Sequence, residues 1–468
     1  MTKSSAGRAT EQNRFGSTAT DRMVAEILRA APNDMGGALD VTGEGALPSV
    51  YAVTDLAAAS IGATGLALAG LLRSIDGRRR AVAVDRRLAS FWFAASLRPD
   101  GWAPPPPWDP IAGDYRAADG WIRLHTNAPR HRSAALAVLG VEAGKAAVAA
   151  AVAGRTAGAL EAEVVAAGGC AAVMHSQAVW LASEPGRSVA AEPLIDWRDT
   201  GAAPQLFAPI DAARPLAGLR VLDLTRVLAG PVATRLLALL GADVLRIDPP
   251  DWDEPGVVPE VMPGKRTARL DLTVEEDRSR FVQLLAKADV LVHGYRPGAL
   301  DGLGFGEAIR QDVRPGLIEV MLDAYGWSGP WKGRRGFDSL VQMSCGIAEA
   351  GMRHLGRDRP TPLPVQALDH ATGYLMAFAV LAALRHRREA GRSMRARLSL
   401  ARTALLLTGH AAGGEAALAP EGPADVANEV EATGWGPARR LVFPLSVEGV
   451  TLAAARPAMP LGTHAAAW

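Results

Sequence analysis

The feature that most constrains the fold is an alternation of apolar strands and helices that begins at Leu219. The chain reads LRVLDLT, then a turn RVLAGP, then a helix VATRLLALLGA, then a second strand DVLRID. A helical stretch near residues 275–288 leads to a third strand, DVLVHGY, and residues 317–322 give a fourth, LIEVML. Continuous apolar runs of this length are typical of strands buried on both faces. Strands and helices that alternate at this spacing predict an α/β fold with a parallel, Rossmann-like sheet.

The chain of 468 residues is too long for one ordinary domain, so more than one unit is expected. Residues 201–214 are rich in alanine and proline, and the sequence changes character at Pro215. Upstream, the strand GWIRLHTN, the helices that follow it and the strand CAAVMHS predict a small α/β unit. We therefore expect a polar segment at 1–45, a small-domain-like segment at 46–210 and a Rossmann-like domain at 215–468.

Charge and cysteine content exclude several classes of function. Lys and Arg number 50 against 49 Asp and Glu, and the two signs are interspersed, so we expect no nucleic-acid partner. Cys170 and Cys345 form no CxxC pair, so we expect no metal site. The first twenty residues lack an apolar core, and runs such as 375–384 are too short to cross a bilayer, which predicts a cytoplasmic protein without a membrane partner.

The turn after the first strand is the first candidate for a ligand site. Gly230 follows the strand and Pro231 opens the helix, and open α/β sheets bind ligands at the carboxyl ends of their strands. Backbone N–H groups of such a turn can hold a phosphate or an adenine ring. The turn does not read GxGxxG, so a nicotinamide dehydrogenase, which only the Rossmann-like pattern favours, is a poor alternative.

Five motifs in this half of the chain resemble one known family. They are PLAGLRVLDLTRVLAGPVATRLLALLGADVLRID, GKRTARLDL, ADVLVHGYRPGALDGLGF, YGWSGPW and LDHATGYLMAFAVLAAL. Their order and spacing over residues 214–410 resemble the class III coenzyme A-transferases, of the kind that act on formyl-CoA and carnitine. The resemblance implies that family's architecture, a Rossmann-like sheet with a second, smaller α/β domain.

The resemblance also implies that Asp369, in the last motif, is the catalytic nucleophile. A carboxylate can attack an acyl-CoA thioester to give a mixed anhydride, and the released thiolate can return to give an aspartyl-CoA thioester. An acceptor carboxylate then takes the coenzyme A through a second anhydride. Asp369 precedes a long helical stretch, so the alternative is that it only caps that helix.

The family's coenzyme A contacts carry over to several positions of this chain. The matching residues are Val227, Leu228, Ala229, Leu270, Asp271, Leu272, Tyr295, Arg296, Tyr325 and Gly326. Three positions depart from the family pattern where a basic residue or an asparagine is common, namely Pro249, Gly294 and Gly302. Three cations are candidates to replace the lost contacts, or are simply surface charges: Arg246, Lys265 and Arg266.

The N-terminal half resembles the second half of the same family, as though the small domain had moved to the front of the chain. Residues 119–140 and 168–185 are similar to the family's small domain, and PAMPLGTHAAAW is similar to its usual C-terminus. Residues 50–93 also resemble residues 365–407, an imperfect second copy of the helix that carries Asp369. Asp55 falls near Asp369 only if one or two residues are inserted, so we interpret Asp55 as a helix cap.

The resemblance implies a coenzyme A thioester and a carboxylic acid as substrates, no permanently bound cofactor, and a homodimer. One alternative is a 2-methylacyl-CoA racemase, which needs a histidine where this chain has Phe337, next to Asp338. Phenylalanine cannot move a proton, so racemisation is disfavoured, and His370 is expected to be a polar surface residue. The other alternative is a coenzyme A-binding or scaffold protein without catalysis.

Overall fold

The computed structural model describes residues 16–203 and 211–468. Its centre is a seven-stranded sheet with the strand order β10-β9-β8-β11-β12-β13-β7. Six of these strands run parallel, and β7 pairs antiparallel with β13 at one edge. The strands are β7 Asp196–Ala202, β8 Arg220–Leu224, β9 Asp243–Asp248, β10 Arg266–Arg269, β11 Val290–His293, β12 Ile318–Asp323 and β13 Arg392–Ser399. The predicted α/β fold with a Rossmann-like sheet is confirmed.

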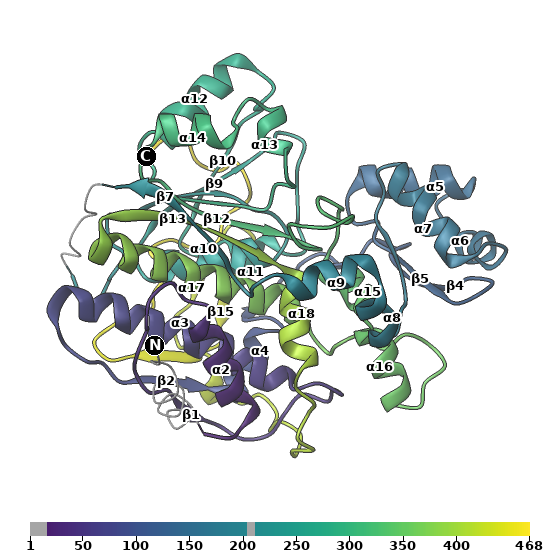
Figure 1. Ribbon diagram of the computed structural model, residues 1–468, viewed down its shortest axis with the longest axis horizontal. Coiled ribbons are helices and arrows are strands. Elements are labelled where there is room, and N and C mark those ends of the chain that lie inside the picture. The colour runs from purple at the N-terminus through teal and green to yellow at the C-terminus, as the bar shows by residue number, and fades with distance from the viewer. Residues whose placement is uncertain (1–15, 204–210) are drawn as a thin grey trace, which may run out of the picture.

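Alternate side chains of the strands enter two separate apolar cores, one on each face of the sheet. On one face, Val221, Val292 and Val320 pack with the helices α10 (Ala229–Leu239) and α17 (Ala367–Ala390). On the other face, residues such as Leu222 and Leu291 pack with α12, and α13 and α14 lie beside it (Figure 1). These helices span Glu275–Leu285, Ala299–Gly302 and Glu307–Val313. Helices on both faces explain why the strands are apolar throughout.

A smaller α/β unit stands apart from the sheet, on the right of Figure 1. Its antiparallel strands β4, β5 and β6 carry the helices α5, α6 and α7 around a separate core that includes Ile122, Val148 and Leu160. The elements are β4 Gly113–Arg116, β5 Trp121–Leu124, α5 Pro129–Leu139, α6 Lys145–Ala153, α7 Ala157–Ala166 and β6 Ala171–Val173. The predicted second, smaller α/β unit is therefore present.

The N-terminal helices pack on the main body rather than on this small unit. The helix α3 (Val53–Asp76) lies against α17, and α2 (Ala19–Arg29) lies against α3. The sequence groups residues 53–76 with the small-domain-like segment 46–210, whereas in space they belong to the largest core cluster together with α17. The domain boundaries themselves stay a prediction. Residues 1–15 of the expected polar segment and residues 204–210 of the expected linker lie outside the described residues.

The helices α3 and α17 begin two copies of one structural unit. Each has 24 residues, each follows an N-cap residue with φ near −75° and ψ of 63°, and each ends at a glycine with positive φ, Gly77 or Gly391. A strand and a short helix follow in each copy, β2 (Val82–Asp85) with α4 (Arg86–Trp92), and β13 with α18 (Leu400–Thr408). The two copies align without any insertion, so the expectation that Asp55 matches Asp369 only after one or two inserted residues is wrong. The N-cap of α3 is Ala52, so the interpretation of Asp55 as a helix cap is also wrong.

The remaining elements complete the body and its connections. They are β1 Asp40–Thr42, β3 Leu97–Pro99, α8 Gln177–Ala182, α9 Glu184–Ala191, α11 Val258–Val261, α15 Asp338–Ser344, α16 Ile347–His354, η1 Pro423–Asp425, β14 Glu431–Thr433, β15 Gly436–Arg440 and β16 Leu445–Val447. Among the described residues, α3 and α17 are long and apolar enough to cross a membrane. They are 94% and 100% buried within the protein over their most apolar stretches, and core helices meet the same criteria. The apolar run 375–384 is thus part of a longer buried helix.

Candidate functional site

A cavity of about 690 Å³ opens at the carboxyl ends of the parallel strands, between the sheet and the small unit. The turn after β8 forms one wall, the loops after β9 and β11 form the next, and α5 of the small unit closes the mouth. Seven residues predicted from the sequence line it: Val227, Leu228, Ala229, Asp271, Tyr295, Arg296 and Asp369. Positions more than a hundred residues apart are thereby brought into one space.

Four predicted residues do not line this cavity. Leu270 and Leu272 are buried in the apolar core under α12. Tyr325 is fully buried and its hydroxyl lies 3.1 Å from the Ser344 hydroxyl, while burial raises the pKa of its phenol. Gly326 adopts a φ of 92° and donates its N–H to Asp323, which does line the cavity. Their contact with coenzyme A stays a prediction, and in this structure they support the walls.

Asp369 occupies the first turn of α17 and is 8% exposed. The N-cap of the helix is Gln366, so Asp369 is not itself the cap. Its side chain is placed at the cavity because α17 points its N-terminus there, beside the small apolar residue Ala324 and Leu400. A helix N-terminus favours an anion, which suits a carboxylate that must act in its charged form.

A second carboxyl group, that of Asp338 at the start of α15, holds the N-terminus of α17. Its Oδ2 accepts a hydrogen bond of 2.9 Å from the backbone N–H of Asp369, and the N–H of Leu368 donates to the same side chain. Gln342 donates to the other oxygen and is fixed in turn, since its Oε1 accepts a 2.7 Å hydrogen bond from the N–H of Leu363. Asp338 thus positions the backbone that carries Asp369.

The two carboxyl groups influence each other's ionisation. Burial raises the pKa of Asp369 well above its usual value, and the nearby negative charge of Asp338 raises it further. Burial also raises the pKa of Asp338 to about 6, although its hydrogen bonds from Gln342 and the backbone oppose that change. The pair therefore retains a proton to higher pH than isolated aspartates do.

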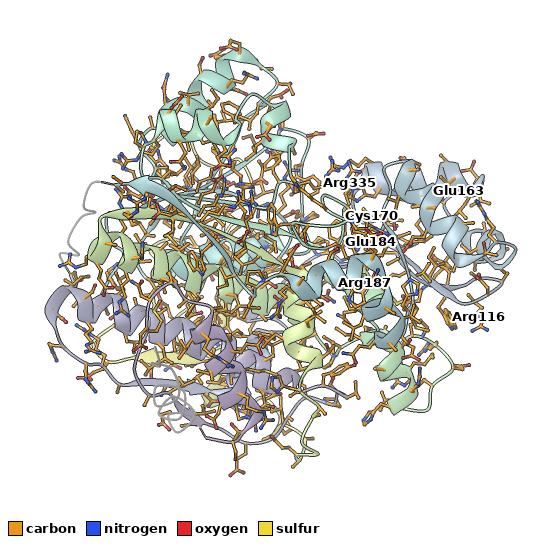
Figure 2. All side chains as sticks on the ribbon, in the orientation of Figure 1. Arg116, Glu163, Cys170, Glu184, Arg187 and Arg335 are labelled. Atoms are coloured by element: carbon orange, nitrogen blue, oxygen red, sulfur yellow. The ribbon has the colours of Figure 1, made fainter. Side chains whose placement is uncertain are left out.

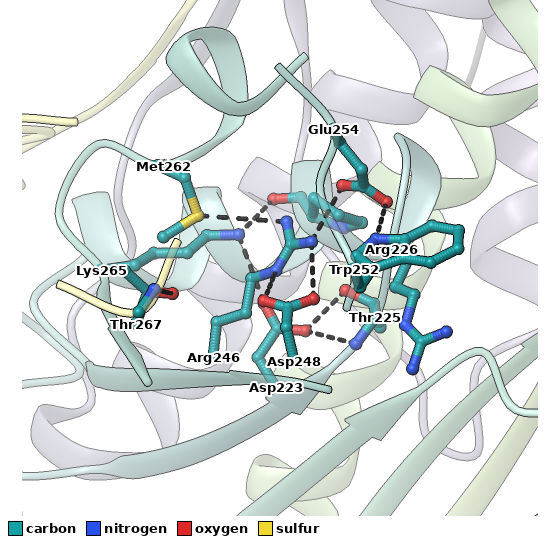
Figure 3. A network of polar contacts seen from close by, with 12 residues as sticks. Asp223, Thr225, Arg226, Arg246, Asp248, Trp252, Glu254, Met262, Lys265 and Thr267 are labelled. Atoms are coloured by element: carbon teal, nitrogen blue, oxygen red, sulfur yellow. Dashed lines mark hydrogen bonds and ion pairs between the residues drawn. The ribbon is translucent and has the colours of Figure 1, made fainter. Parts of the chain in front are cut away.

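The turn after β8 is held in a strained conformation. Val227 has a φ of 64°, and it is the one residue other than glycine with positive φ among residues 16–203 and 211–468. A β-branched residue in this region costs on the order of 1–3 kcal/mol. Its N–H donates to Glu254 over 2.6 Å, and Glu254 is held by Arg246 and by the indole N–H of Trp252 (Figure 3).

The buried charges behind this turn support it and do not face the ligand space. Arg246 is fully buried and pairs with Asp248 and Glu254. Lys265 is equally buried and contacts Asp223 and Thr234, and burial lowers its pKa to about 8. Figure 3 shows both groups within one network. Arg266 pairs with Asp243 instead. The expectation that these three cations replace missing phosphate contacts is therefore wrong.

Five arginines line the cavity, and one of them, Arg334, pairs with Glu161. The other four are Arg130, Arg226, Arg296 and Arg335. In the part of the chain that the structure describes, none of them forms an ion pair with a carboxylate. Arg226 lies 4.6 Å from the centre of the Trp252 ring, and its Nη2 lies 3.3 Å from the Tyr295 hydroxyl. Burial lowers the pKa of Arg130, and the charges of Arg226 and Arg335 lower it further. Cations gathered without acidic partners are suited to an anionic ligand.

Sequence reasoning found Arg296 but missed the other three arginines. Arg226 is the first residue of the predicted turn RVLAGP, so its position was a usable signal. Arg130 and Arg335 come from α5 and from the loop before α15, which lie far apart in sequence and meet only in the folded chain. Figure 2 shows Arg335 and Cys170 where the small unit joins the body, with the Arg335 guanidinium 3.4 Å from the carbonyl of Gly168.

The histidines near the cavity are neutral and shielded. Burial lowers the pKa of His131, in the cavity wall, to about 4, and that of His125 to about 3. His125 stacks on Phe337 with 3.7 Å between ring centres. His370 is also buried, stacked on Phe93, so the expectation of a surface histidine is wrong.

Residues 216–439, just under half of the chain, match the family model described as CoA-transferase family III. This part of the chain belongs to that family. It includes the six parallel strands of the sheet, the strained turn, Asp338 and Asp369.

Several curated proteins are similar to part of the chain. Acetyl-coenzyme A transferase nodX of Hypoxylon pulicicidum is 35% identical over 246 residues, which are 49% of this chain and 41% of that protein. The probable fatty acyl-CoA transferase Rv3272 of Mycobacterium tuberculosis is 37% identical over 199 residues, 38% of this chain and 48% of that one. The chain thus spans less than half the length of these relatives. A crystal structure of Rv3272 covers 41% of this chain and 57% of that one, with 32% identity and a TM-score of 0.38.

Proposed function

We propose that this protein transfers coenzyme A from an acyl-CoA thioester to a carboxylic acid, with Asp369 as the nucleophile. The observation that carries the proposal is the presence of Asp369 in the same cavity as four arginines without acidic partners. Coenzyme A combines a polyanionic nucleotide end with a neutral thioester end. A cavity with guanidinium groups at its mouth and a buried carboxyl group in its wall is complementary to both ends.

The proposed reaction has four steps, and Asp369 takes part in each of them. It attacks the thioester carbonyl, the C–S bond breaks, and a mixed anhydride and the coenzyme A thiolate result. The thiolate attacks the aspartyl carbonyl of the anhydride and releases the donor acid, which leaves an aspartyl-CoA thioester. The acceptor carboxylate attacks this thioester and expels the thiolate, which then attacks the acceptor carbonyl and restores Asp369. Covalent catalysis thereby divides one difficult exchange into smaller steps.

Asp338 supports this reaction by fixing the backbone of Asp369. Because the N–H groups of Leu368 and Asp369 are bound to Asp338, the nucleophile keeps one orientation as it forms and breaks bonds. The strained turn at Val227, held by Glu254, fixes the facing wall. Racemisation is disfavoured, since Phe337 occupies the position at which a racemase has a histidine.

The decisive experiment is to trap the acyl-enzyme. The protein is incubated with a panel of acyl-CoA thioesters, treated with hydroxylamine or borohydride, and digested for peptide mass spectrometry, with Asp369→Asn as the matched variant. A hydroxamate or a reduced residue at position 369 that the variant lacks supports the proposal. Calorimetric binding of coenzyme A esters without any adduct would favour a binding protein without catalysis, and an adduct at Asp55 would move the nucleophile to the other repeat.

The homodimer and the cytoplasmic location stay predictions that accompany this function. Sedimentation of the purified chain tests the first, and fractionation of cells that express it tests the second. The acyl group and the acceptor acid are proposed only as classes, a thioester of coenzyme A and a carboxylic acid.

A further inference from the structure

A second cavity, of about 190 Å³, lies on the face of the sheet that α13 and α14 cover. Its floor is formed by β11, β12 and β13, and the loop that carries Trp327 and Lys332 closes one side. It shares Tyr295 and Arg296 with the larger cavity. Since one water occupies about 30 Å³ in the liquid, the space suits a ligand of a few heavy atoms.

The floor is polar where a buried sheet face is ordinarily apolar. On this face Leu291 of β11 pairs with Glu319 of β12, which pairs in turn with Arg395 of β13. Arg397 follows two residues later on the same face and lies 5.0 Å from the Trp327 ring centre. Arg395 is 2% exposed, so the strand places arginine on a buried surface, which is costly without a partner.

Positive charge exceeds negative charge around this second cavity. Its lining includes five cations, Arg296, Arg310, Lys332, Arg395 and Arg397, against the acids Asp301 and Glu307. Behind the wall, Glu319 is already bound, at 2.6 Å from Arg310 and 3.1 Å from His293. Glu307 is bound to Arg395. Asp196 lies 4.0 Å from Arg397, so the five cations face four acids, and one positive charge remains without a matching acid around the cavity.

Hydrogen-bond donors in the lining are also unsatisfied. Within residues 16–203 and 211–468, the Nε atoms of Arg310, Arg395 and Arg397 are buried without a hydrogen-bond partner. Buried donors of charged groups are costly to leave without a partner, so three in one place favour a bound acceptor. An oxyanion supplies both the acceptor oxygens and the missing negative charge.

We propose that this second cavity binds a small oxyanion, either inorganic phosphate or a short dicarboxylate, separately from the substrate cavity. Lys332 provides the charge that the existing acids leave unmatched. The guanidinium groups of Arg310, Arg395 and Arg397, whose buried Nε atoms lack partners, set the orientation. The site is distinct from the proposed transferase chemistry and does not depend on it.

The test is calorimetry on the full chain at pH 8 and low ionic strength, with phosphate and malonate titrated separately. We expect saturable one-to-one binding that weakens at least tenfold in Arg397→Gln and in Lys332→Gln. Arg392→Gln is the matched control, because Arg392 lies on the same strand but is exposed and paired with Asp199. It should bind as the parent does. Circular dichroism establishes that each variant is folded.

The outcomes separate the two ligand sources and the two cavities. Saturation by phosphate alone identifies a tetrahedral oxyanion, and saturation by malonate alone identifies a dicarboxylate. The proposal fails if neither anion saturates, or if Arg392→Gln weakens binding as much as Arg397→Gln does. It also fails if Arg226→Gln, in the larger cavity, abolishes binding while Arg397→Gln leaves it intact.

Discussion

Asp55 and Asp369 occupy the same position in two packed helices of equal length, but their surroundings are opposite. Each is the third residue of its helix, α3 or α17. Asp55 accepts a 2.7 Å hydrogen bond from Thr20 and pairs with Arg86, 31 residues further on. The same interval from Asp369 ends at Leu400, which cannot pair and instead lines the cavity with it. One copy therefore holds a neutralised carboxylate and the other an unpaired one.

This contrast predicts that the two aspartates respond differently to the same isosteric change. Asp369→Asn removes the proposed nucleophile, and loss of such a group lowers kcat by at least about 10³-fold. Asp55→Asn removes a group that already has its partners, so kcat should stay within about twofold. Transfer of coenzyme A between a donor thioester and an acceptor acid, followed by chromatography, measures both. Equal losses in the two variants would contradict the assignment.

The same pair should show opposite effects on stability. The pKa of Asp369 is raised in the folded protein, so its carboxyl favours folding below the unfolded pKa, and that contribution is lost as pH rises through the folded pKa. Asp369→Asn should therefore raise Tm at pH 8 more than at pH 4.5. Asp55→Asn weakens the ion pair with Arg86 and should lower stability by about 1 kcal/mol. Thermal denaturation at the two pH values checks both signs, and a Tm for Asp369→Asn below that of the parent at pH 8 would refute the first.

The parallel sheet could be predicted because each of its inner strands is a continuous apolar run in the sequence. The apolar runs at 219–225, 243–248, 289–295 and 317–322 each form a strand that is buried on both faces and ends within a residue or two of the expected bounds. The antiparallel edge strand β7 was not predicted. Its sequence, DWRDTGA, is polar because it lies at the edge of the sheet, so local pattern gives no apolar run to detect.

Only the part of the site that lies in continuous sequence motifs could be predicted. Asp369 and the turn at Val227 lie in continuous motifs, whereas the arginines at the cavity mouth are single residues in unrelated segments. Arg246 and Lys265 appeared to be free cations because the sequence does not show that Asp223, Asp248 and Glu254 surround them. Pairing of buried charges is a property of the folded chain, and composition cannot reveal it.

The arginines at the cavity mouth should control affinity for the nucleotide end of a coenzyme A ester. Arg130→Gln removes one unpaired cation and should weaken binding about tenfold, the effect of one charge-assisted hydrogen bond. Arg132→Gln, two residues away in α5, is the matched control because Arg132 already pairs with Asp109 at 3.4 Å. Calorimetry with acetyl-CoA at two salt concentrations measures both. The difference between variants should shrink at high salt, and its persistence there would argue against an electrostatic role.

The strained turn at Val227 should lower the thermal stability of the protein while it keeps the wall of the cavity fixed. Glycine adopts the observed φ of 64° without strain, so Val227→Gly should unfold at a slightly higher temperature than the parent. The freed turn should also bind coenzyme A esters more weakly, because the wall is less fixed. Leu228→Ala keeps the negative φ of its position and should lower Tm instead. A lower Tm for Val227→Gly would mean that packing of the valine side chain outweighs the backbone strain.

The Asp338–Asp369 pair predicts how the rate depends on pH. The nucleophile must be ionised, and its pKa is raised by burial and by the charge of Asp338, so kcat/KM should rise with pH as Asp369 loses its proton. Asp338→Asn removes the repelling charge but keeps an oxygen that can accept the N–H of Asp369. The acid limb of the kcat/KM profile should therefore move to lower pH, even where the maximal rate falls through poorer positioning. Gln342→Glu should move it to higher pH, since a second acid then lies against Asp338. An unchanged acid limb in both variants would show that Asp338 acts on the backbone alone and does not influence the ionisation of Asp369.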